Sequence, residues 1–132
     1  MPARRLRSYL PRRLRARVAS PEEMRMGSPQ YGRLILDGMA ISRPVSVEAR
    51  SLLWSDDGTR LAAQELVAWG DGPTTRVVVF DTEHQTEIAS SPPRNGIGNP
   101  LRFERGALVY RHWHQGVGEQ EMRLSLGCDR AP

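Results

Sequence analysis

The chain contains no lysine, only one cysteine and few aromatic residues, and it has no long hydrophobic segment. The single cysteine, Cys128, excludes an intramolecular disulfide framework and is typical of a protein in a reducing cytosol. No apolar run approaches the ~20 residues that a membrane-spanning helix needs, which excludes a transmembrane protein. No apolar core of a secretory signal follows the N-terminal positive charges. These absences together predict a cytoplasmic protein.

All 19 basic residues are therefore arginine, and they are unevenly distributed along the 132 residues. Seven arginines and no acidic residue lie within residues 1–20, which gives this segment a net charge of +7. The other 12 arginines and all 15 acidic residues leave residues 21–132 with a net charge of −3. The length is that of one domain. We predict an Arg-rich N-terminal arm (1–20), a linker or short helical turn (21–30) and a single β domain (31–132).

The arm has two sequence features with different implications. Leu6, Leu10, Leu14 and Val18 recur every four residues, as on one face of a helix, which Pro11 would interrupt. The arginines are suited to nucleic-acid phosphates, and they are Arg4, Arg5, Arg7, Arg12, Arg13, Arg15 and Arg17. An anionic membrane surface, an organelle transit signal and a solvated extension are the other interpretations of this composition.

Residues 20–30 are rich in turn formers. Ser20 and Glu23 have the spacing of a capping box, and Pro21 suits a first helical position, which predicts one short helical turn. Gly27 and Pro29 end it.

From Tyr31 onward, apolar and polar residues alternate with the period of a β-strand. Asp37-Gly38 between two apolar runs predicts a hairpin turn within 31–42, and Val77–Phe80 is apolar on both faces, as in a central strand. The remaining predicted strands are 45–54, 60–69, 76–81, 86–89, 101–104, 107–114 and 119–126, with a loop over 90–100. Residues Leu61, Ala63, Val67 and Trp69 are expected to share one face. The pattern predicts an all-β fold, an open, twisted antiparallel meander of about eight short strands.

Two stretches of this meander are alike. The segment Leu53-Trp54-Ser55-Asp56-Asp57-Gly58-Thr59-Arg60-Leu61-Ala62, followed by Val77-Val78-Val79-Phe80-Asp81-Thr82, resembles the blade repeat of WD-type and Tricorn-type β-propellers. The resemblance covers residues 51–89, and a weaker copy over 100–126 lacks the tryptophan and the Asp-Gly turn. It implies that Trp54 packs between sheets and that Asp57-Gly58 forms a hairpin turn. A closed propeller needs at least about four blades, so two blade-like repeats predict an open sheet.

The residues suited to catalysis or metal binding are few. His112 and His114 flank Trp113 and would share one face of a strand, where a third ligand such as His84, Cys128 or an acid would complete a zinc site. The glycine-rich segment 96–100 opens no helix, which argues against a phosphate loop. Asp56-Asp57 lacks the spaced oxygens of a calcium loop. We expect neither an enzyme nor a cofactor or metal.

An open sheet leaves edge strands that a partner protein or a second copy would cover. Short β-meanders with one degenerate blade are similar to bacterial immunity proteins, which implies an inhibitor that covers a cognate toxin. The acidic body would be complementary to a basic toxin surface. The residues expected to bind the partner are Trp69, Asp71, Arg94, His112, Trp113 and His114. The alternative is a nucleic-acid or ribonucleoprotein component that acts through the arm.

Overall fold

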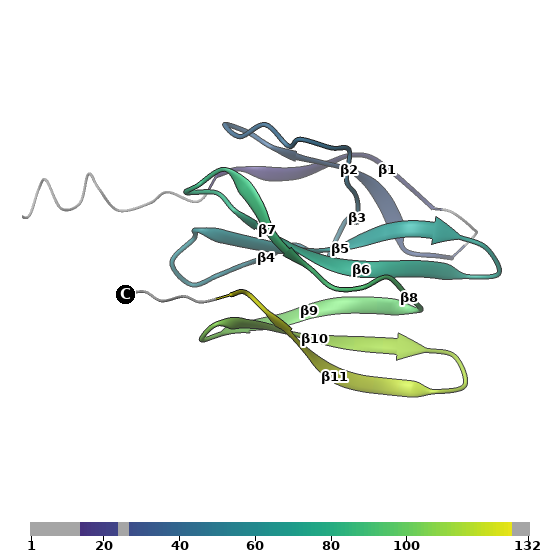
Figure 1. Ribbon diagram of the computed structural model, residues 1–132. Helices are drawn as coiled ribbons and strands as arrows, with labels where there is room; N and C mark the ends of the chain where they lie inside the picture. Colours follow the sequence, from purple (N-terminus) through teal and green to yellow (C-terminus); the bar gives the residue numbers. More distant parts are fainter. Residues whose placement is uncertain (1–13, 24–26, 128–132) are drawn as a thin grey trace, which may run out of the picture.

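The computed structural model describes residues 14–23 and 27–127, which form antiparallel β-strands joined by turns (Figure 1). The predicted all-β, antiparallel class is confirmed. The strands are β1 (Ala16–Glu23), β2 (Gln30–Leu36), β3 (Ser46–Glu48), β4 (Leu53–Trp54), β5 (Arg60–Trp69), β6 (Pro73–Asp81), β7 (Thr86–Ser90), β8 (Arg94–Asn95), β9 (Ile97–Glu104), β10 (Ala107–His114) and β11 (Gly118–Ser125). No helix of the described residues is long and apolar enough to span a bilayer.

The strands make two sheets of unequal size. The larger sheet has the order β1-β2-β3-β5-β6-β7, with β4 paired to β5 and β8 paired to β6. The smaller sheet has the order β11-β10-β9. Both sheets are open, and the smaller one packs beneath the β5–β6 pair in the view of Figure 1.

Strand β6 lies at the centre of the molecule and is covered on both faces, as the run of apolar residues 77–80 predicts. Val78 and Phe80 belong to a core cluster with residues of β2, β3 and β5. Val77 and Val79 face the other way and pack with Leu108 and further residues of the smaller sheet. All four side chains are at most 1% exposed. The β5–β6 pair is therefore the common wall of two apolar cores.

The start of the β domain differs from the prediction, because β1 takes up the end of the arm and the first residues of the linker. Leu14, Ala16 and Val18 pack against the core cluster of β2 and β3, while Arg15 and Arg17 are exposed. A four-residue spacing is a multiple of two, so the pattern fits a strand as well as a helix. In the structure these residues form a strand, because they pair with β2. Residues 1–13 lie outside the described residues.

The helical turn predicted at Ser20–Glu23 is wrong, since these residues belong to β1. Ser20 has a φ of 48°, and the register with β2 shifts between Ala19 and Glu22. Pro21 sits within this irregularity, where a strand tolerates proline.

The loop predicted over residues 90–100 is partly wrong, because β8 and the start of β9 lie within it. Its prolines occupy positions that the sheets tolerate. Pro92 and Pro93 lie between strands, and Pro100 sits beside a register shift in the β9–β10 pair. Backbone pairing therefore continues through a segment whose composition is typical of a loop.

Two further strand predictions need correction. A register shift between Leu66 and Ala68 turns Val67 to solvent, where it is 42% exposed, although Leu61 and Ala63 of the same strand are buried. After the turn at Asp37, the predicted second strand is reduced to one bridge, Leu36 to Met39. The likeness of β4–β7 to a propeller blade stays a prediction. In the structure these strands are not a separate sheet, because β5 also pairs with β3 and thereby joins them to β1 and β2.

Candidate functional site

One end of the molecule holds the residues expected to bind a partner. This end, called the hairpin-end surface below, consists of the β5–β6 turn, strand β8 and the β10–β11 turn, on the right of Figure 1. Its residues are 67–73, 94–96 and 112–118. The three segments are far apart in sequence, and the two sheets bring them together.

Short backbone contacts fix these segments against one another. The Gly96 amide donates a hydrogen bond of 2.8 Å to the carbonyl of Pro73, next to the β5–β6 turn. Strand β8 pairs with β6 through Thr74 and Asn95. Gly96 has a φ of +109°, and a Cβ placed there would lie 2.2 Å from the carbonyl oxygen of Trp113. Only glycine fits this position, because backbone occupies the space of a side chain.

His112 is a part of the framework beneath this surface. It is 5% exposed, and its Nε2 lies 2.7 Å from the carbonyl oxygen of Asn95. The imidazole thereby joins the smaller sheet to β8. His114 lies two residues further on the same face and is half-buried.

The hairpin-end surface carries every large hydrophobic side chain found exposed in the described part of the chain. These are Val67 at 42%, Trp113 at 45% and Val117 at 65% exposure. Trp69 is half-buried, and its Nε1 is hidden from solvent without a hydrogen-bond acceptor among the described residues. Val67 comes from the larger sheet and Trp113 and Val117 from the smaller one, so exposed apolar side chains of both sheets lie at the same end, an arrangement suited to an interaction site.

Polar groups lie at the same end of the molecule. Asp71 is exposed at the tip of the β5–β6 turn. The exposed Arg94 places Nη1 3.1 Å from the sulfur of Met122. A hollow of about 290 Å³ lies between β8 and the β10–β11 turn, and its lining includes Arg94, His112, His114 and Val117. The structure thus brings Trp69, Asp71, Arg94, His112, Trp113 and His114 to one end, with His112 beneath the surface and the others at least partly accessible.

Within the described chain, no third metal-ligating side chain joins His112 and His114. His84, one of the ligands considered, lies at the opposite end of the sheets, and Cys128 lies outside the described residues. The one group of metal-ligating side chains that the described residues bring together is Asp81, Glu83 and His84.

The residues of the nucleic-acid alternative are largely outside the described part of the chain, because Arg4, Arg5, Arg7, Arg12 and Arg13 fall within 1–13. Of the two described, Arg17 faces Asp37, with Nε 3.6 Å from Oδ1, and Arg15 is exposed.

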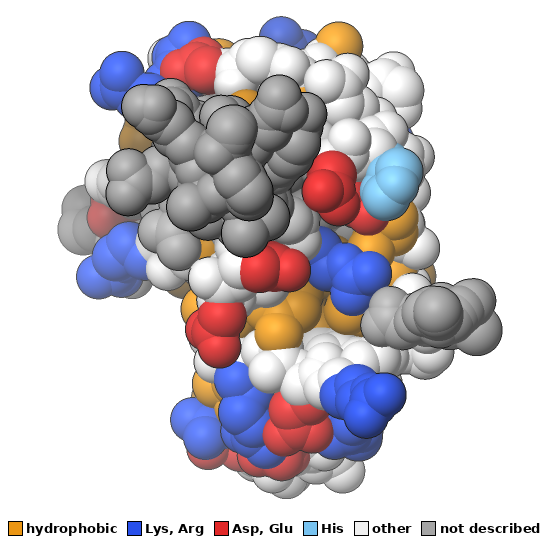
Figure 2. Space-filling view, turned by 90° about the vertical axis from the view of Figure 1, so that its left-hand side faces the viewer, with side chains coloured by type: hydrophobic (Ala, Val, Ile, Leu, Met, Phe, Trp, Pro, Cys, Tyr) orange, Lys and Arg blue, Asp and Glu red, His pale blue; other side chains and the backbone are white. Residues whose placement is uncertain are grey.

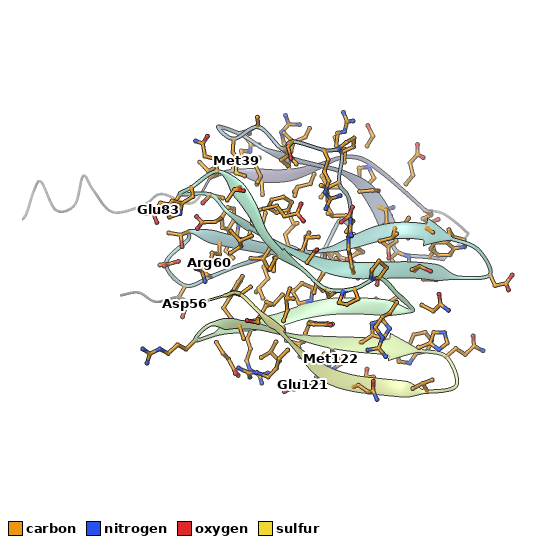
Figure 3. The ribbon with its side chains drawn as sticks, viewed as in Figure 1. Met39, Asp56, Arg60, Glu83, Glu121 and Met122 are labelled. Carbon is orange, nitrogen blue, oxygen red and sulfur yellow. The ribbon has the colours of Figure 1, made fainter. Side chains whose placement is uncertain are left out.

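A larger hollow of about 750 Å³, the turn-end cleft, lies at the opposite end, between the turns β4–β5, β6–β7 and β9–β10. Figure 2 looks onto this end and shows hydrophobic side chains in the hollow, with arginine and acidic side chains around it. Leu53, Trp54, Leu101 and Phe103 supply the apolar part of the lining. Asp56, Arg60 and Glu83 also belong to the lining, and Figure 3 shows them together at this end.

Most polar groups of the turn-end cleft hold the turns themselves. Asp57 Oδ1 accepts hydrogen bonds from the Ser55 and Thr59 hydroxyls and from the Thr59 amide. Burial would raise the pKa of Asp57, but these hydrogen bonds outweigh it and lower the pKa. Both hydroxyls are therefore engaged in holding the β4–β5 turn. From the sequence, Asp56 and Asp57 were predicted only to form a turn, since nothing in their spacing shows that three distant turns meet at this cleft.

Asp81 and His84 form a second polar pair in the turn-end cleft. Asp81 Oδ1 accepts hydrogen bonds from the amides of Glu83 and His84, and Oδ2 lies 2.9 Å from His84 Nδ1. The hydrogen bond that the His84 imidazole donates to Asp81, followed by the negative charge of Asp81, raises the pKa of His84. Burial alone would raise the pKa of Asp81, but its hydrogen bonds lower it. The arrangement orients an exposed imidazole, and no nucleophile of the cleft is bonded to it within the described residues.

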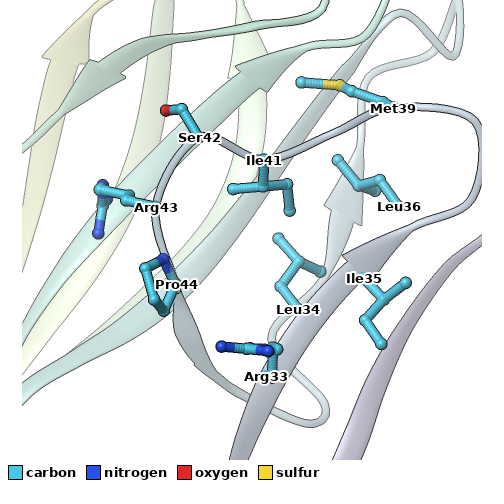
Figure 4. Close-up of a pocket in the computed structure, with 9 residues that line it drawn as sticks. All are labelled: Arg33, Leu34, Ile35, Leu36, Met39, Ile41, Ser42, Arg43 and Pro44. Carbon is cyan, nitrogen blue, oxygen red and sulfur yellow. The ribbon is translucent and has the colours of Figure 1, made fainter.

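A third hollow, of about 300 Å³, lies between β2 and the segment 39–44 (Figure 4). Leu34, Leu36 and Met39 line it and are buried. Arg43, at its margin, donates hydrogen bonds to Glu65 and Glu87. The Arg43 guanidinium is thus already paired with two carboxylates, and the rest of the lining combines apolar side chains with Arg33 and Ser42.

Comparison with known proteins adds no assignment: no protein-family model matches the chain, and no curated protein or solved structure shows detectable similarity to it.

Proposed function

We propose that this protein is a non-enzymatic protein-binding module whose partner docks on the hairpin-end surface. The observation that carries the proposal is the gathering of Val67, Trp113 and Val117, the exposed large hydrophobic side chains of the described residues, at one end of the molecule. Tryptophan and arginine contribute most to the affinity of many interfaces. Trp69, Trp113 and Arg94 all lie at this end.

The framework of this surface supports rigid docking. Gly96 and His112 fix β8 against both sheets through their contacts with Pro73 and Asn95. A preorganised surface loses little conformational entropy on binding, which favours affinity. The resemblance to immunity-type proteins makes a toxin domain the specific partner that we propose.

The test is affinity capture from the native cell lysate with the full-length chain and a version beginning at Leu14, each with and without nuclease. Leu14 is chosen because it is the first described residue that packs against the core, two residues before β1 begins. We expect one stoichiometric protein partner with both versions, independent of nuclease. Recovery of RNA or ribosomal material only with the arm present would instead support the nucleic-acid alternative.

Two variants locate the binding surface. Trp113→Ala should weaken binding of the captured partner about 30-fold or more, as expected for a central interface tryptophan. His84→Ala is the matched control, because His84 is exposed at the opposite end and should leave affinity unchanged. Isothermal titration calorimetry measures both. Equal affinities for the two variants would refute docking on the hairpin-end surface.

A further inference from the structure

The free edge of the smaller sheet differs from the other sheet edges of the described chain. Strand β11 pairs with β10 in one unbroken register from Ser125 to Gly118. It contains no proline and no register shift. Figure 1 shows β11 at the lower margin of the molecule, and Figure 3 places Glu121 and Met122 there. An edge of this kind is a template for pairing with another strand.

The other edges carry features that prevent such pairing. Strand β1 has Pro21 and a register shift, and β7 is five residues long with a register shift of its own. Strand β9 contains Pro100 beside a third shift, and its Gly98 amide donates to the hydroxyl of Thr75. Natural proteins protect edges with such shifts, prolines and short strands. Among the described strands, β11 alone combines length with an uninterrupted edge.

The hydrogen bonds of β10–β11 determine which backbone groups of β11 face outward. The Leu126 amide donates a hydrogen bond of 2.9 Å to the carbonyl of Gly106, which continues the register of the β10–β11 pair. In an antiparallel pair these bonds involve alternate residues. The even-numbered residues of β11 therefore bond to β10, and the odd-numbered residues present their amides and carbonyls at the free edge. These are Glu119, Glu121, Arg123 and Ser125.

We propose that β11 pairs antiparallel with β11 of a second copy about a two-fold axis at Met122, joining the two small sheets into one. This register places Glu121 opposite Arg123 of the second copy, twice, and Glu119 opposite Ser125. The outward backbone groups of these residues then meet as hydrogen-bonded pairs, giving about eight new bonds.

Charge selects this register over its neighbours. A two-fold axis at Glu121 or Arg123 places that residue opposite its own copy, and an axis at Gln120 places Glu119 opposite Glu121. Like charges in directly opposed positions destabilise a strand pair, whereas opposite charges stabilise it. The axis at Met122 places opposite charges together twice and opposes no like charges. An axis at Leu124 would place Arg123 opposite Ser125 and would therefore lack these opposite-charge pairs.

The side chains of β11 also fit this pairing. Glu121 and Arg123 are 54% and 57% exposed on the outer face, so they are accessible to a second copy. Glu121 bonds to Arg102 through Oε2. Its second oxygen is thus available in the described structure for Arg123 of the other copy. On the inner face the half-buried Met122 would contact its own copy and lose its remaining exposure.

Sedimentation equilibrium of the full-length chain from about 1 to about 100 µM tests the oligomeric state over the range of a micromolar dimer. We expect a dimer for the natural sequence. Glu121→Arg should weaken dimerisation about tenfold or more, since it places arginines opposite arginines twice. Glu121→Arg combined with Arg123→Glu restores complementary pairs and should restore the dimer. Glu119→Arg is the matched control, because Glu119 faces a serine.

A covalent probe tests the register itself. In a Cys128→Ser background, Met122→Cys places two cysteines in a non-hydrogen-bonded pair with Cα atoms about 4.5 Å apart, within disulfide range. Mild oxidation should give a covalent dimer on non-reducing gels. Gln120→Cys lies on the same face, but the two copies would be more than about 10 Å apart, so it should not cross-link. Circular dichroism confirms that each variant folds.

A monomer throughout the concentration range overturns the proposal. So does a dimer that Glu121→Arg leaves intact, or equal cross-linking of the two cysteine variants. The dimer is independent of partner docking at the hairpin-end surface. Trp113→Ala should leave its dissociation constant unchanged, which separates the failure of one proposal from that of the other.

Discussion

Replacing Glu65 with glutamine should destabilise the protein by about 2 kcal/mol, because this carboxylate neutralises one arginine of β6 and one of the segment before β3. Glu65 is 5% exposed. Its oxygens accept hydrogen bonds of 2.7 and 2.9 Å from Arg43 and one of 2.9 Å from Arg76. Arg43 also contacts Glu87 of β7. The group therefore ties the segment before β3 to β5, β6 and β7.

The expected magnitude follows from the burial of the partners. Removing one member of a fully buried ion pair costs about 3–5 kcal/mol. Here the side chains of Arg43 and Arg76 are 33% and 26% exposed, so water can partly solvate them once the carboxylate is gone. Glutamine keeps the shape and one acceptor oxygen, which lowers the cost to about 2 kcal/mol. Glu119→Gln is the control and should cost less than about 0.5 kcal/mol, since Glu119 makes an exposed ion pair.

The same group predicts a dependence on pH. Burial would raise the pKa of Glu65, but the hydrogen bonds and charges of Arg43 and Arg76 outweigh it and lower the pKa. A carboxyl group whose pKa is lower in the folded state stabilises the fold above its unfolded pKa, about 4.3 for glutamate. This contribution is lost as the pH falls through the lowered, folded-state pKa. The difference between the natural protein and Glu65→Gln should therefore shrink below about pH 4.

Urea unfolding followed by circular dichroism at pH 7 and at several lower pH values measures both effects. The transition midpoint of Glu65→Gln should fall at pH 7 with an unchanged slope. A loss at pH 7 no greater than that of Glu119→Gln, or a difference that stays constant down to pH 3, would refute the reasoning.

Three further predictions rest on single features of the fold. Gly96→Ala should lower the free energy of unfolding by about 3 kcal/mol or more, because a Cβ there would lie 2.2 Å from a backbone oxygen of β10. Gly116→Ala is the control: Gly116 has a positive φ but open space around it, so the loss should be about 1 kcal/mol. Urea unfolding measures both. Phe80→Ala should cost about 3–5 kcal/mol in thermal or urea unfolding, since Phe80 is 1% exposed; a loss below about 1 kcal/mol would contradict its place in the core. The pKa of His84, measured by NMR titration, should lie above its ordinary value and fall in Asp81→Asn. The stabilisation from this raised pKa is present at low pH and is lost as the pH rises through it.

The sequence predicted the fold class and the central strand because alternation directly records which side chains are buried. Residues 77–80 are apolar at every position, and the structure covers both faces of β6 with separate cores. The strands 60–69 and 107–114 also match β5 and β10 in their bounds. In each case the information lies within a few consecutive residues.

The prediction failed where one pattern suited two structures. The four-residue spacing of Leu14 and Val18 fits a helix and a strand alike, and only the edge of β2 decides between them. The composition of 90–100 suggested a loop, yet β8 and β9 begin there, since the prolines fall where no ladder bond is needed. Val67 turned outward because a register shift reverses the alternation.

For the candidate site, too, the sequence predicted one part and the structure alone showed the other. The sequence identified Trp69, Arg94 and Trp113 by residue type, since tryptophan and arginine are frequent in interfaces. It contained no sign that these residues meet at one end, or that His112 lies beneath them with its ring against Asn95. Nor did it show that Glu65 neutralises two arginines from different segments.

The sequence by itself determined the all-β class, the strands β5 and β10 and the two-sided burial of β6, because these depend on neighbouring residues and on the two-residue period of a strand. The tertiary structure alone decided which distant turns share a surface and which sheet edges remain open. It also decided that the odd-numbered residues of β11 face outward, since this follows from the hydrogen bonds with β10. Register and sheet order join residues that are far apart in the chain, and local alternation carries no information about either.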